Sequence, residues 1–457
     1  MGRSLALQFG GRSRAALILT AIAASSAFGA QAGPRPPSVV ILLADDLGYG
    51  DLGCYGSPDT KTPVLDRMAR EGARFTDGYA AAPLCSPTRV SLLTGQYQQR
   101  IGNAYEDYLG GGAPGLDATK HATLAMLMKR AGYHTAIYGK WNVSGGRNEA
   151  RADLLPGAHG FDHWVGVHAN HDQHTHRRIK QPDKLDLWED GKPLVRDGFT
   201  DDFLTDAAVS CIRTHRDEPF LLYLPFLSPH NPLQAHDDPK VYPDGDRRAY
   251  VKMVERLDHN VGRVLGAIQE AGIGPDTLVM FTSDNGGQQA ARNLPCSGRK
   301  GQLLEGGIRV PLILLQPGVV PAGTTVDYPA ITMDVTATAL AAGGAKVPAD
   351  HPLDGIDLRP IVQGRRPPGP RTIFWRRRVL DFRARTNEVA ARAVREGDWK
   401  LYWRGARPKL FNLREDIGET RDRSEEDPAL AARLAKKLRD WERAVTPPEV
   451  LFGARPQ

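Results

Sequence analysis

The 457-residue sequence predicts an α/β fold built on a large mixed, mostly parallel sheet with helices on both faces. Three observations lead to this prediction. Apolar runs of strand length alternate along the chain with helical segments. Polar residues follow directly after these runs, as they do at the carboxyl ends of parallel strands. After residue 365 the pattern changes to a hairpin, a further strand and one helix, which predicts a small C-terminal α+β domain with an antiparallel sheet.

The predicted strands of the large sheet are short runs rich in Val, Ile and Leu. Runs of this kind, with few polar interruptions, are typical of strands buried on both faces. They cover residues 39–44, 135–138, 220–227, 277–282 and 310–315.

The predicted helices carry start and stop signals. Pro63 suits a first helical turn, and Gly72 ends that helix. A second helix covers residues 119–131. The long segment 247–271 places an apolar residue every three or four positions on one face. Residues 159–178 are rich in His and Arg and lack periodicity, which predicts a loop.

The C-terminal part begins after a segment rich in Pro, Arg and Gly at residues 364–371. Residues 393–402 read as a hairpin around Gly397, and residues 409–413 as a further strand. Residues 428–445 form a helix with an apolar face. The arginines at 376–378 are interpreted as a solvated face. We therefore divide the chain into a signal peptide at 1–32, a catalytic domain at 33–365 and a C-terminal subdomain at 366–457.

The first 32 residues have the features of an export signal. A basic beginning is followed by the apolar run 15–30 and by Ala30-Gln31-Ala32, a small-residue cleavage pattern. The alternative is an uncleaved anchor. No later stretch is long and apolar enough to cross a membrane. We therefore expect an exported protein, periplasmic or extracellular.

The net charge and the number of cysteines limit the range of functions that the sequence suggests. The formal net charge of +6 fits an acidic substrate but is no nucleic-acid signature. Four cysteines are few for a disulfide framework in a chain of this length. One disulfide among Cys54, Cys211 and Cys296 is possible, and the sequence does not choose the pair.

The stretch from Ala82 to Gly95 combines a nucleophile with features that attract anions. We expect Ser86 to be the N-cap and Pro87 to lie in the first turn of a helix. Cys85 would then lie at the helix N-terminus, where free N–H groups favour negative charge. Arg89, one turn further on, can reach back toward the same place.

Four oxygen-bearing side chains follow two of the predicted strands: Asp45, Asp46, Asp284 and Asn285. Clustered carboxylates without a cation would raise one another's pKa values. Because the set contains no His or Cys, it suits Ca²⁺ or Mg²⁺ better than Zn²⁺. Lys140, His230 and Lys300 would supply donors to a tetrahedral anion nearby.

These motifs resemble the blocks of the type I, formylglycine-dependent sulfatases, an arylsulfatase-like branch of the alkaline phosphatase superfamily. The matching blocks occur in the family's order along most of the mature chain. They are Cys85-Ser86-Pro87-Thr88-Arg89 with Leu93-Thr94-Gly95, the opening 39–51, Gly139-Lys140-Trp141, Ser228-Pro229-His230, Ser283-Asp284-Asn285-Gly286, 300–311 and 397–401.

The resemblance implies an alkaline-phosphatase-like sandwich and a role for each matched residue. Cys85 would be converted to formylglycine by a generating enzyme, and Arg89 would hold it. Asp45, Asp46, Asp284 and Asn285 would bind Ca²⁺ together with residue 85, with Mg²⁺ as the alternative ion. Lys140 and Lys300 would bind sulfate, and His230 would protonate the leaving oxygen.

One position departs from the family pattern. Lys-Trp-His is usual, and here the third residue is Asn142. The resemblance assigns to that His the base that regenerates the aldehyde, and an amide cannot accept a proton at neutral pH.

Three functions remain open at this point. The first is an exported sulfatase acting on a sulfate monoester of a carbohydrate or aryl alcohol. The second is a related phosphodiester or phosphonate hydrolase, and the third is an impaired sulfoglycan-binding protein. The segment with His168, His171, His174, His176, Arg177 and Arg178 either lines an entrance for a polyanion or is a solvated loop.

Overall fold

A ten-stranded mixed sheet forms the centre of the fold in a computed structural model that describes residues 35–110, 113–145, 151–169, 174–176, 187–238, 240–381 and 386–446. In spatial order its strands are β13 (Thr324–Val326), β2 (Ala73–Phe75), β12 (Leu312–Leu315), β11 (Thr277–Ser283), β1 (Ser38–Ala44), β10 (Phe220–Pro225), β4 (His134–Lys140), β5 (His163–Val167), β7 (Trp188–Glu189) and β8 (Lys192–Pro193). The five strands from β11 to β5 are parallel to one another.

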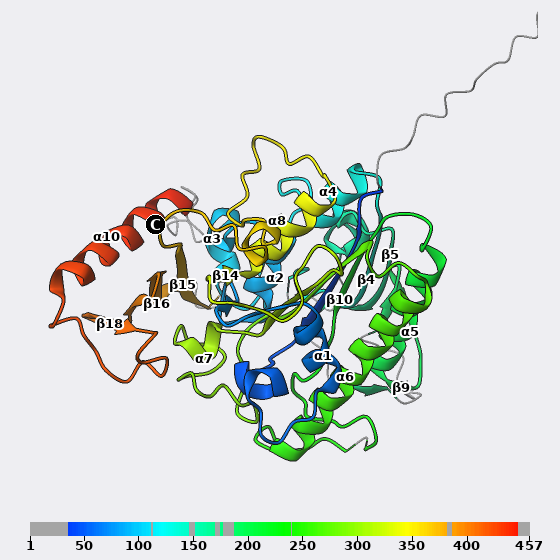
Figure 1. The fold of residues 1–457 in the computed structure, drawn as a ribbon, viewed down its shortest axis with the longest axis horizontal. Helices are drawn as coiled ribbons and strands as arrows, with labels where there is room; N and C mark the ends of the chain where they lie inside the picture. The colour runs from blue at the N-terminus through cyan, green and yellow to red at the C-terminus, as the bar shows by residue number, and fades with distance from the viewer. Residues whose placement is uncertain are drawn as a thin grey trace, which may run out of the picture. The chain divides into compact units, whose positions relative to one another are not determined.

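Helices cover both faces of this sheet, as the sequence predicted (Figure 1). Alternate residues of β1 enter two different cores, because successive strand side chains point to opposite faces. Ile41 belongs to the core under α2 (Cys85–Thr94), α4 (Leu124–Arg130) and α8 (Thr332–Ala342). Leu42 belongs to the core under α1 (Pro63–Glu71), α5 (Thr200–Thr214) and α6 (Arg247–Glu270). The α/β prediction is confirmed.

Shorter elements connect these layers. The short helices are α3 (Gln98–Ile101), α7 (Glu305–Ile308) and α9 (Arg359–Val362), with 3₁₀ turns η1 (Tyr49–Asp51), η2 (Gly53–Tyr55), η3 (Asn103–Glu106), η4 (Ala152–Leu154) and η5 (Pro156–His159). Two small ribbons pair β3 (Gly78–Tyr79) with β14 (Ala330–Ile331) and β6 (Thr175–His176) with β9 (Gly198–Phe199).

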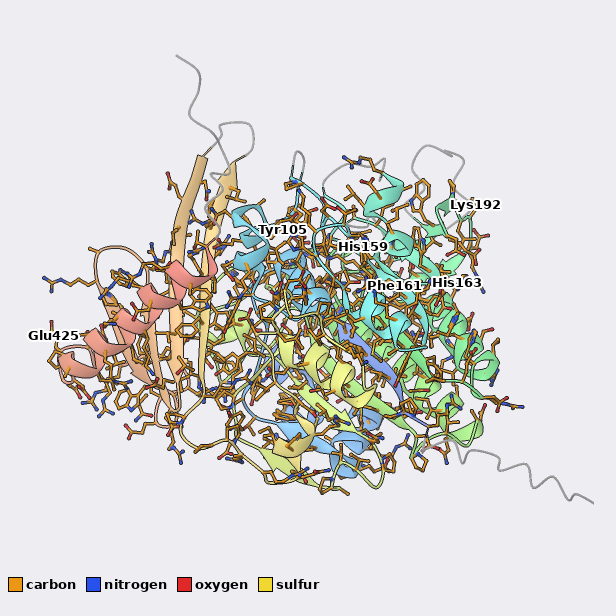
Figure 2. All side chains as sticks on the ribbon, turned by 90° about the horizontal axis from the view of Figure 1, so that it is seen from above. Tyr105, His159, Phe161, His163, Lys192 and Glu425 are labelled. Carbon is orange, nitrogen blue, oxygen red and sulfur yellow. The ribbon has the colours of Figure 1, made fainter. Side chains whose placement is uncertain are left out.

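A second, four-stranded antiparallel sheet follows near the C-terminus, as predicted. Its strands are β15 (Thr372–Asp381), β16 (Thr386–Glu396), β17 (Trp399–Trp403) and β18 (Pro408–Asn412). α10 (Pro428–Val445) packs Leu434, Leu438 and Trp441 against it. In Figure 2, Glu425 marks the α10 end of the molecule, while His163 and Lys192 mark the far end of the large sheet.

Buried charges join the C-terminal sheet to the rest of the fold. Lys400 of β17 is fully buried, and its Nζ lies 2.8 Å from Glu305 Oε1 and 2.9 Å from Glu419 Oε1. The other carboxylate oxygen of Glu305 accepts from Tyr79 Oη at 2.6 Å and from Arg309 Nη1 at 2.9 Å. Residues 36–457 accordingly form one compact unit.

Several local expectations are corrected. Residues 163–167 form strand β5 rather than loop, because their aromatic and β-branched side chains are buried beside β4. Arg376 is 3% exposed rather than solvated, since its guanidinium binds both carboxylate oxygens of Glu106. All four cysteines lie in the described part of the chain and are free, so the possible disulfide is not formed.

The predicted export signal at residues 1–32 lies outside the described residues, and so do His171, Arg177 and Arg178. Within the described ranges, none of the helices is both long enough and apolar enough to span a bilayer.

Candidate active site

The carboxyl ends of four neighbouring strands bring most of the predicted site residues together. Asp45 and Asp46 follow β1, Lys140 ends β4, and Asp284 and Asn285 follow β11. His230 follows β10 after a short turn. Because these strands are parallel, their carboxyl ends lie along one edge of the sheet. The sheet therefore places in one cluster side chains that are far apart in the sequence.

Cys85 is the first residue of helix α2, which begins after the extended residue Leu84. Ser86 is therefore inside the helix and is not its N-cap, a difference of two residues from the predicted start. The helix ends at Gly95, whose φ of +69° suits glycine. Cys85 is 3% exposed, and its sulfur lies within 4.8 Å of carboxylate oxygens of Asp45 and Asp284.

Fully buried cations bind these carboxylates. Lys140 Nζ lies 2.6 Å from Asp45 Oδ2. Arg89 donates from Nη2 to Asp284 Oδ2 at 2.8 Å, and its Nη1 donates to the Lys140 carbonyl at 2.6 Å. Burial alone would raise the pKa of Asp45, but Lys140 and the other neighbouring cations hold it well below its usual range.

Lys300 and Asn285 hold the second aspartate. Lys300 Nζ lies 2.7 and 2.8 Å from the two carboxylate oxygens of Asp46, and Asn285 Nδ2 donates to Oδ1 at 2.6 Å. Asp46 has a φ of +65°, a conformation that Asp tolerates better than most residues. Its backbone N–H donates to Asp284 Oδ1 at 3.2 Å, which fixes the two aspartates relative to each other.

Glycine is required just before Lys140. Gly139 has a φ of +145°, and a Cβ atom there would lie 1.9 Å from the Pro225 carbonyl oxygen. The close approach of β4 to β10 at this point thus depends on the missing side chain.

The oxygen set fits a hard divalent cation. Asp45 Oδ1 and Asn285 Oδ1 are buried and accept no hydrogen bond, a costly state unless a cation contacts them. Burial and the neighbouring Asp45 raise the pKa of Asp284 to about 7, as expected of carboxylates that face one another. Carboxylate and amide oxygens are the ligands that Ca²⁺ and Mg²⁺ prefer.

His230 faces the same cluster from the β10 side. Its Nε2 lies 3.6 Å from Asp46 Oδ2, and its Nδ1 is hydrogen-bonded to the Asn231 carbonyl. Burial and Lys140 lower its pKa to about 4. The turn before it is held by buried Asp201, whose carboxylate accepts from the N–H groups of Leu227 and Ser228 at 2.9 and 3.0 Å.

Asn142 is held beside Cys85. Its Oδ1 accepts a hydrogen bond from Ser86 Oγ at 2.7 Å, and its side chain is buried. Its φ of +59° lies in the left-handed region, where Asn is among the favoured non-glycine residues.

Sequence reasoning missed two residues that build this site, Gln288 and Asp201, and one contact between residues that it had named. Gln288 donates from Nε2 to Asp46 Oδ2 at 2.6 Å, and its place just after the Asp284 block was a usable signal. The bond from Ser86 to Asn142 joins two separate blocks, and Asp201 lies on a helix that the sequence analysis did not identify. No local pattern indicated either contact.

The histidine-rich segment neither lines an entrance nor forms a solvated loop where its side chains are described. His168 is 7% exposed and His174 is fully buried. His174 Nε2 is hydrogen-bonded to the His230 carbonyl at 2.7 Å, so His174 helps to position the residue that faces the cluster.

Known proteins resemble this chain over most of its length. The Sulfatase family model matches residues 37–345. N-acetylgalactosamine-6-sulfatase of Rattus norvegicus is 35% identical over 77% of this chain and 70% of its own length. Arylsulfatase A of Bos taurus is 33% identical over 81% of this chain and 76% of its own. The solved structure of Ps i-CgsB in complex with k-i-k-neocarrahexaose has a TM-score of 0.81 and 29% identity, and the match covers 92% of this chain and 96% of that one.

Proposed function

Because the chain belongs to the sulfatase family and is a sulfuric ester hydrolase, we propose that it removes sulfate from a sulfated carbohydrate with a formylglycine made from Cys85 and a bound Ca²⁺. The observation that carries the proposal is the cluster itself. A buried cysteine at a helix N-terminus lies within 4.8 Å of two carboxylates. In the same cluster, one carboxylate oxygen of Asp45 and the amide oxygen of Asn285 accept no hydrogen bond.

Asp45, Asp46, Asp284 and Asn285 would hold the Ca²⁺ together with residue 85. The ion would polarise a sulfate oxygen and offset the charge that develops on it. The fit is supported by the all-oxygen donor set and by the two buried oxygens that accept no hydrogen bond, Asp45 Oδ1 and Asn285 Oδ1.

The chain's own cations would bind the ester and orient the nucleophile. The hydrated aldehyde of formylglycine would supply that nucleophile in place of the thiol. Lys140 and Lys300 would bind sulfate oxygens, because buried ammonium groups are strong hydrogen-bond donors. Arg89 binds Asp284 through Nε and Nη2 and so fixes a carboxylate next to residue 85.

His230 would protonate the leaving oxygen. Burial and Lys140 lower its pKa in the metal-free site, which favours the neutral ring near pH 7. A bound sulfate ester brings negative charge into the cluster, and nearby negative charge raises a histidine pKa. Binding of the ester thus shifts the pKa toward the protonated ring that the acid role requires.

The substrate class is taken from the relatives. One relative is named as an N-acetylgalactosamine-6-sulfatase, and one similar structure holds a carrahexaose. The test is to measure sulfate release from sulfated mono- and oligosaccharides and an aryl sulfate, and alcohol release from a phosphodiester and a phosphonate monoester. Preferred release from a sulfated sugar supports it, whereas preferred hydrolysis of the phosphorus esters would refute it.

We also propose that residues 1–32 direct export to the periplasm or the extracellular medium. Ala30-Gln31-Ala32 supports the position of the cut. N-terminal sequencing of the exported protein should begin at Gly33, and a mature chain that starts at Met1 would contradict this.

Asn142 is expected to make the second proton transfer of each turnover slow. Its Oδ1 accepts from Ser86, and an amide offers no basic atom. The wild type should release a burst of leaving group and then turn over slowly. Asn142→His should speed the slow phase by about 10²–10⁴-fold, the usual value of a general base, and leave the rate of the burst largely unchanged.

Stopped-flow release of the leaving group measures both phases, and His is tolerated at positive φ better than most residues. Ser86→Ala is the matched control, because it removes the hydrogen bond to Asn142 without adding a base. A wild type with no burst, together with no gain in Asn142→His, would show that another group supplies the base.

A further inference from the structure

A second cluster of metal-binding side chains lies at the other end of β4. His134 is the first residue of this strand and Lys140 the last, so the two ends are about 20 Å apart at 3.3 Å per residue. His134, Cys211 and His215 each offer one ligand atom within 4.8 Å of the others. His163, labelled in Figure 2, marks this end of the neighbouring strand β5.

Two elements supply the three side chains. Cys211 lies on α5, and His215 caps that helix one turn later, where its N–H donates to the Cys211 carbonyl at 2.9 Å. Residues four apart on a helix lie on the same face. The rings of His134 and His215 are stacked with centroids 3.6 Å apart and planes 10° apart. One helix face and one strand end therefore present two imidazoles and a thiol to the same point.

His215 has a carboxylate partner at Nδ1, whereas the carboxylate nearest His134 lies beyond hydrogen-bond distance. Glu218 Oε1 lies 2.5 Å from His215 Nδ1, and Asp162 Oδ2 lies 3.8 Å from His134 Nδ1. A carboxylate that accepts from Nδ1–H leaves the lone pair on Nε2, and histidines that bind metals usually have this outer partner.

We propose that His134, Cys211 and His215 bind one borderline-soft metal ion of the Zn²⁺ class, separate from the active site. Two imidazoles and a thiolate are the donors that Zn²⁺ prefers, and Ca²⁺, a hard cation, binds such a set poorly. Three protein ligands leave a fourth position for solvent. The two histidine side chains are each 21% exposed, so the ion can enter from solution.

Binding the ion requires two local changes. The stacked rings must tilt so that their nitrogens converge, a movement that partly exposed side chains permit. The Cys211 thiol must release its proton to solvent as the metal–sulfur bond forms, so binding should tighten as pH rises. The bound ion would tie the start of β4 to the end of α5.

Co²⁺ spectroscopy tests the proposal in the full-length Cys85→Ala protein with excess Ca²⁺ present, because this background removes the active-site thiol. The expected result is saturable binding of one Co²⁺ per chain with a thiolate-to-cobalt absorption band, displaced by Zn²⁺. Cys211→Ser should abolish the band. His215→Ala should weaken binding by about 100-fold or more, and Glu218→Gln by about 10-fold, since an outer partner alone is worth 10–100-fold.

Matched controls separate this site from general metal adhesion. Cys54→Ser and His259→Ala change a half-buried free cysteine and an exposed histidine elsewhere and should leave the band unchanged. Zn²⁺ should raise the Tm of the Cys85→Ala protein but not that of its His215→Ala derivative. With Cys85 intact, His215→Ala should turn over at the wild-type rate.

Two results would overturn the proposal. One is a cobalt band that persists in Cys211→Ser, and the other is the absence of saturable binding in the Cys85→Ala protein. If Cys211→Ser does not fold, the surface variants His215→Ala and Glu218→Gln decide. Unchanged affinity in both would refute the site.

Discussion

Replacing Cys85 with alanine is expected to lower the turnover of a sulfate ester by about 10⁴–10⁶-fold, the range lost when an enzyme's nucleophile is removed. The reason is geometric. Residue 85 lies at the N-terminus of α2, and its sulfur is within 4.8 Å of carboxylate oxygens of both Asp45 and Asp284. Binding by Lys140 and Lys300 would survive the change, so KM should move far less than kcat.

The modification of the same residue can be measured directly. A peptide containing residue 85 should be about 18 Da lighter than its cysteine form, because the aldehyde replaces the thiol. Cys54→Ser is the matched control and should leave kcat unchanged, since that free cysteine lies outside the cluster. Full activity from a protein that carries only the unmodified thiol would contradict the proposed nucleophile.

Removing the metal is expected to lower turnover by about 10³-fold, because a bound divalent ion supplies several kcal/mol of charge stabilisation. Ca²⁺ should restore the activity of a chelator-treated sample. Asp284→Asn should have a comparable effect and should not respond to added Ca²⁺, since the carboxylate that faces Asp45 and residue 85 would be lost. Turnover with and without chelator, followed by metal analysis, gives both numbers.

Asp258→Asn is the matched control for this experiment. Asp258 is also buried, with a pKa that burial raises to about 6, but its carboxylate accepts from the N–H groups of Val64 and Leu65 at the start of α1. Its replacement should leave the calcium response intact. A metal-free sample that keeps normal turnover would rule out the proposed ion.

The sequence predicted the sheet and most of the site because both depend on local signals. Short apolar runs marked β1 and β11, and the polar residues after them had to lie at one edge of a parallel sheet. The structure brings together Asp45, Asp284 and Cys85 as expected. The predicted helix start after Ser86 was wrong by two residues, because the helix begins at Cys85 and Pro is tolerated anywhere in the first turn.

Contacts between distant segments were not predictable from local patterns. The bond from Ser86 to Asn142 and the support of the His230 turn by Asp201 depend on tertiary packing. The same applies to Arg376, which a charge run marked as solvated and which folding pairs with Glu106. Secondary-structure propensity and charge pattern indicate whether a segment tends to be exposed or buried, but they do not identify the distant residues that it contacts.

The buried triad of Glu305, Lys400 and Glu419 limits how this protein can evolve. Breaking a buried ion pair by losing one partner typically costs about 3–5 kcal/mol, a large part of the stability of an ordinary domain. Lys400 belongs to the small sheet, while Glu305 follows the loop that carries Lys300. Consider a chimaera in which roughly the last ninety residues come from a relative. It should fold stably only if the relative also has a cation at the position of Lys400 to pair with Glu305. We therefore expect the C-terminal sheet to be inherited together with the loop that carries Lys300.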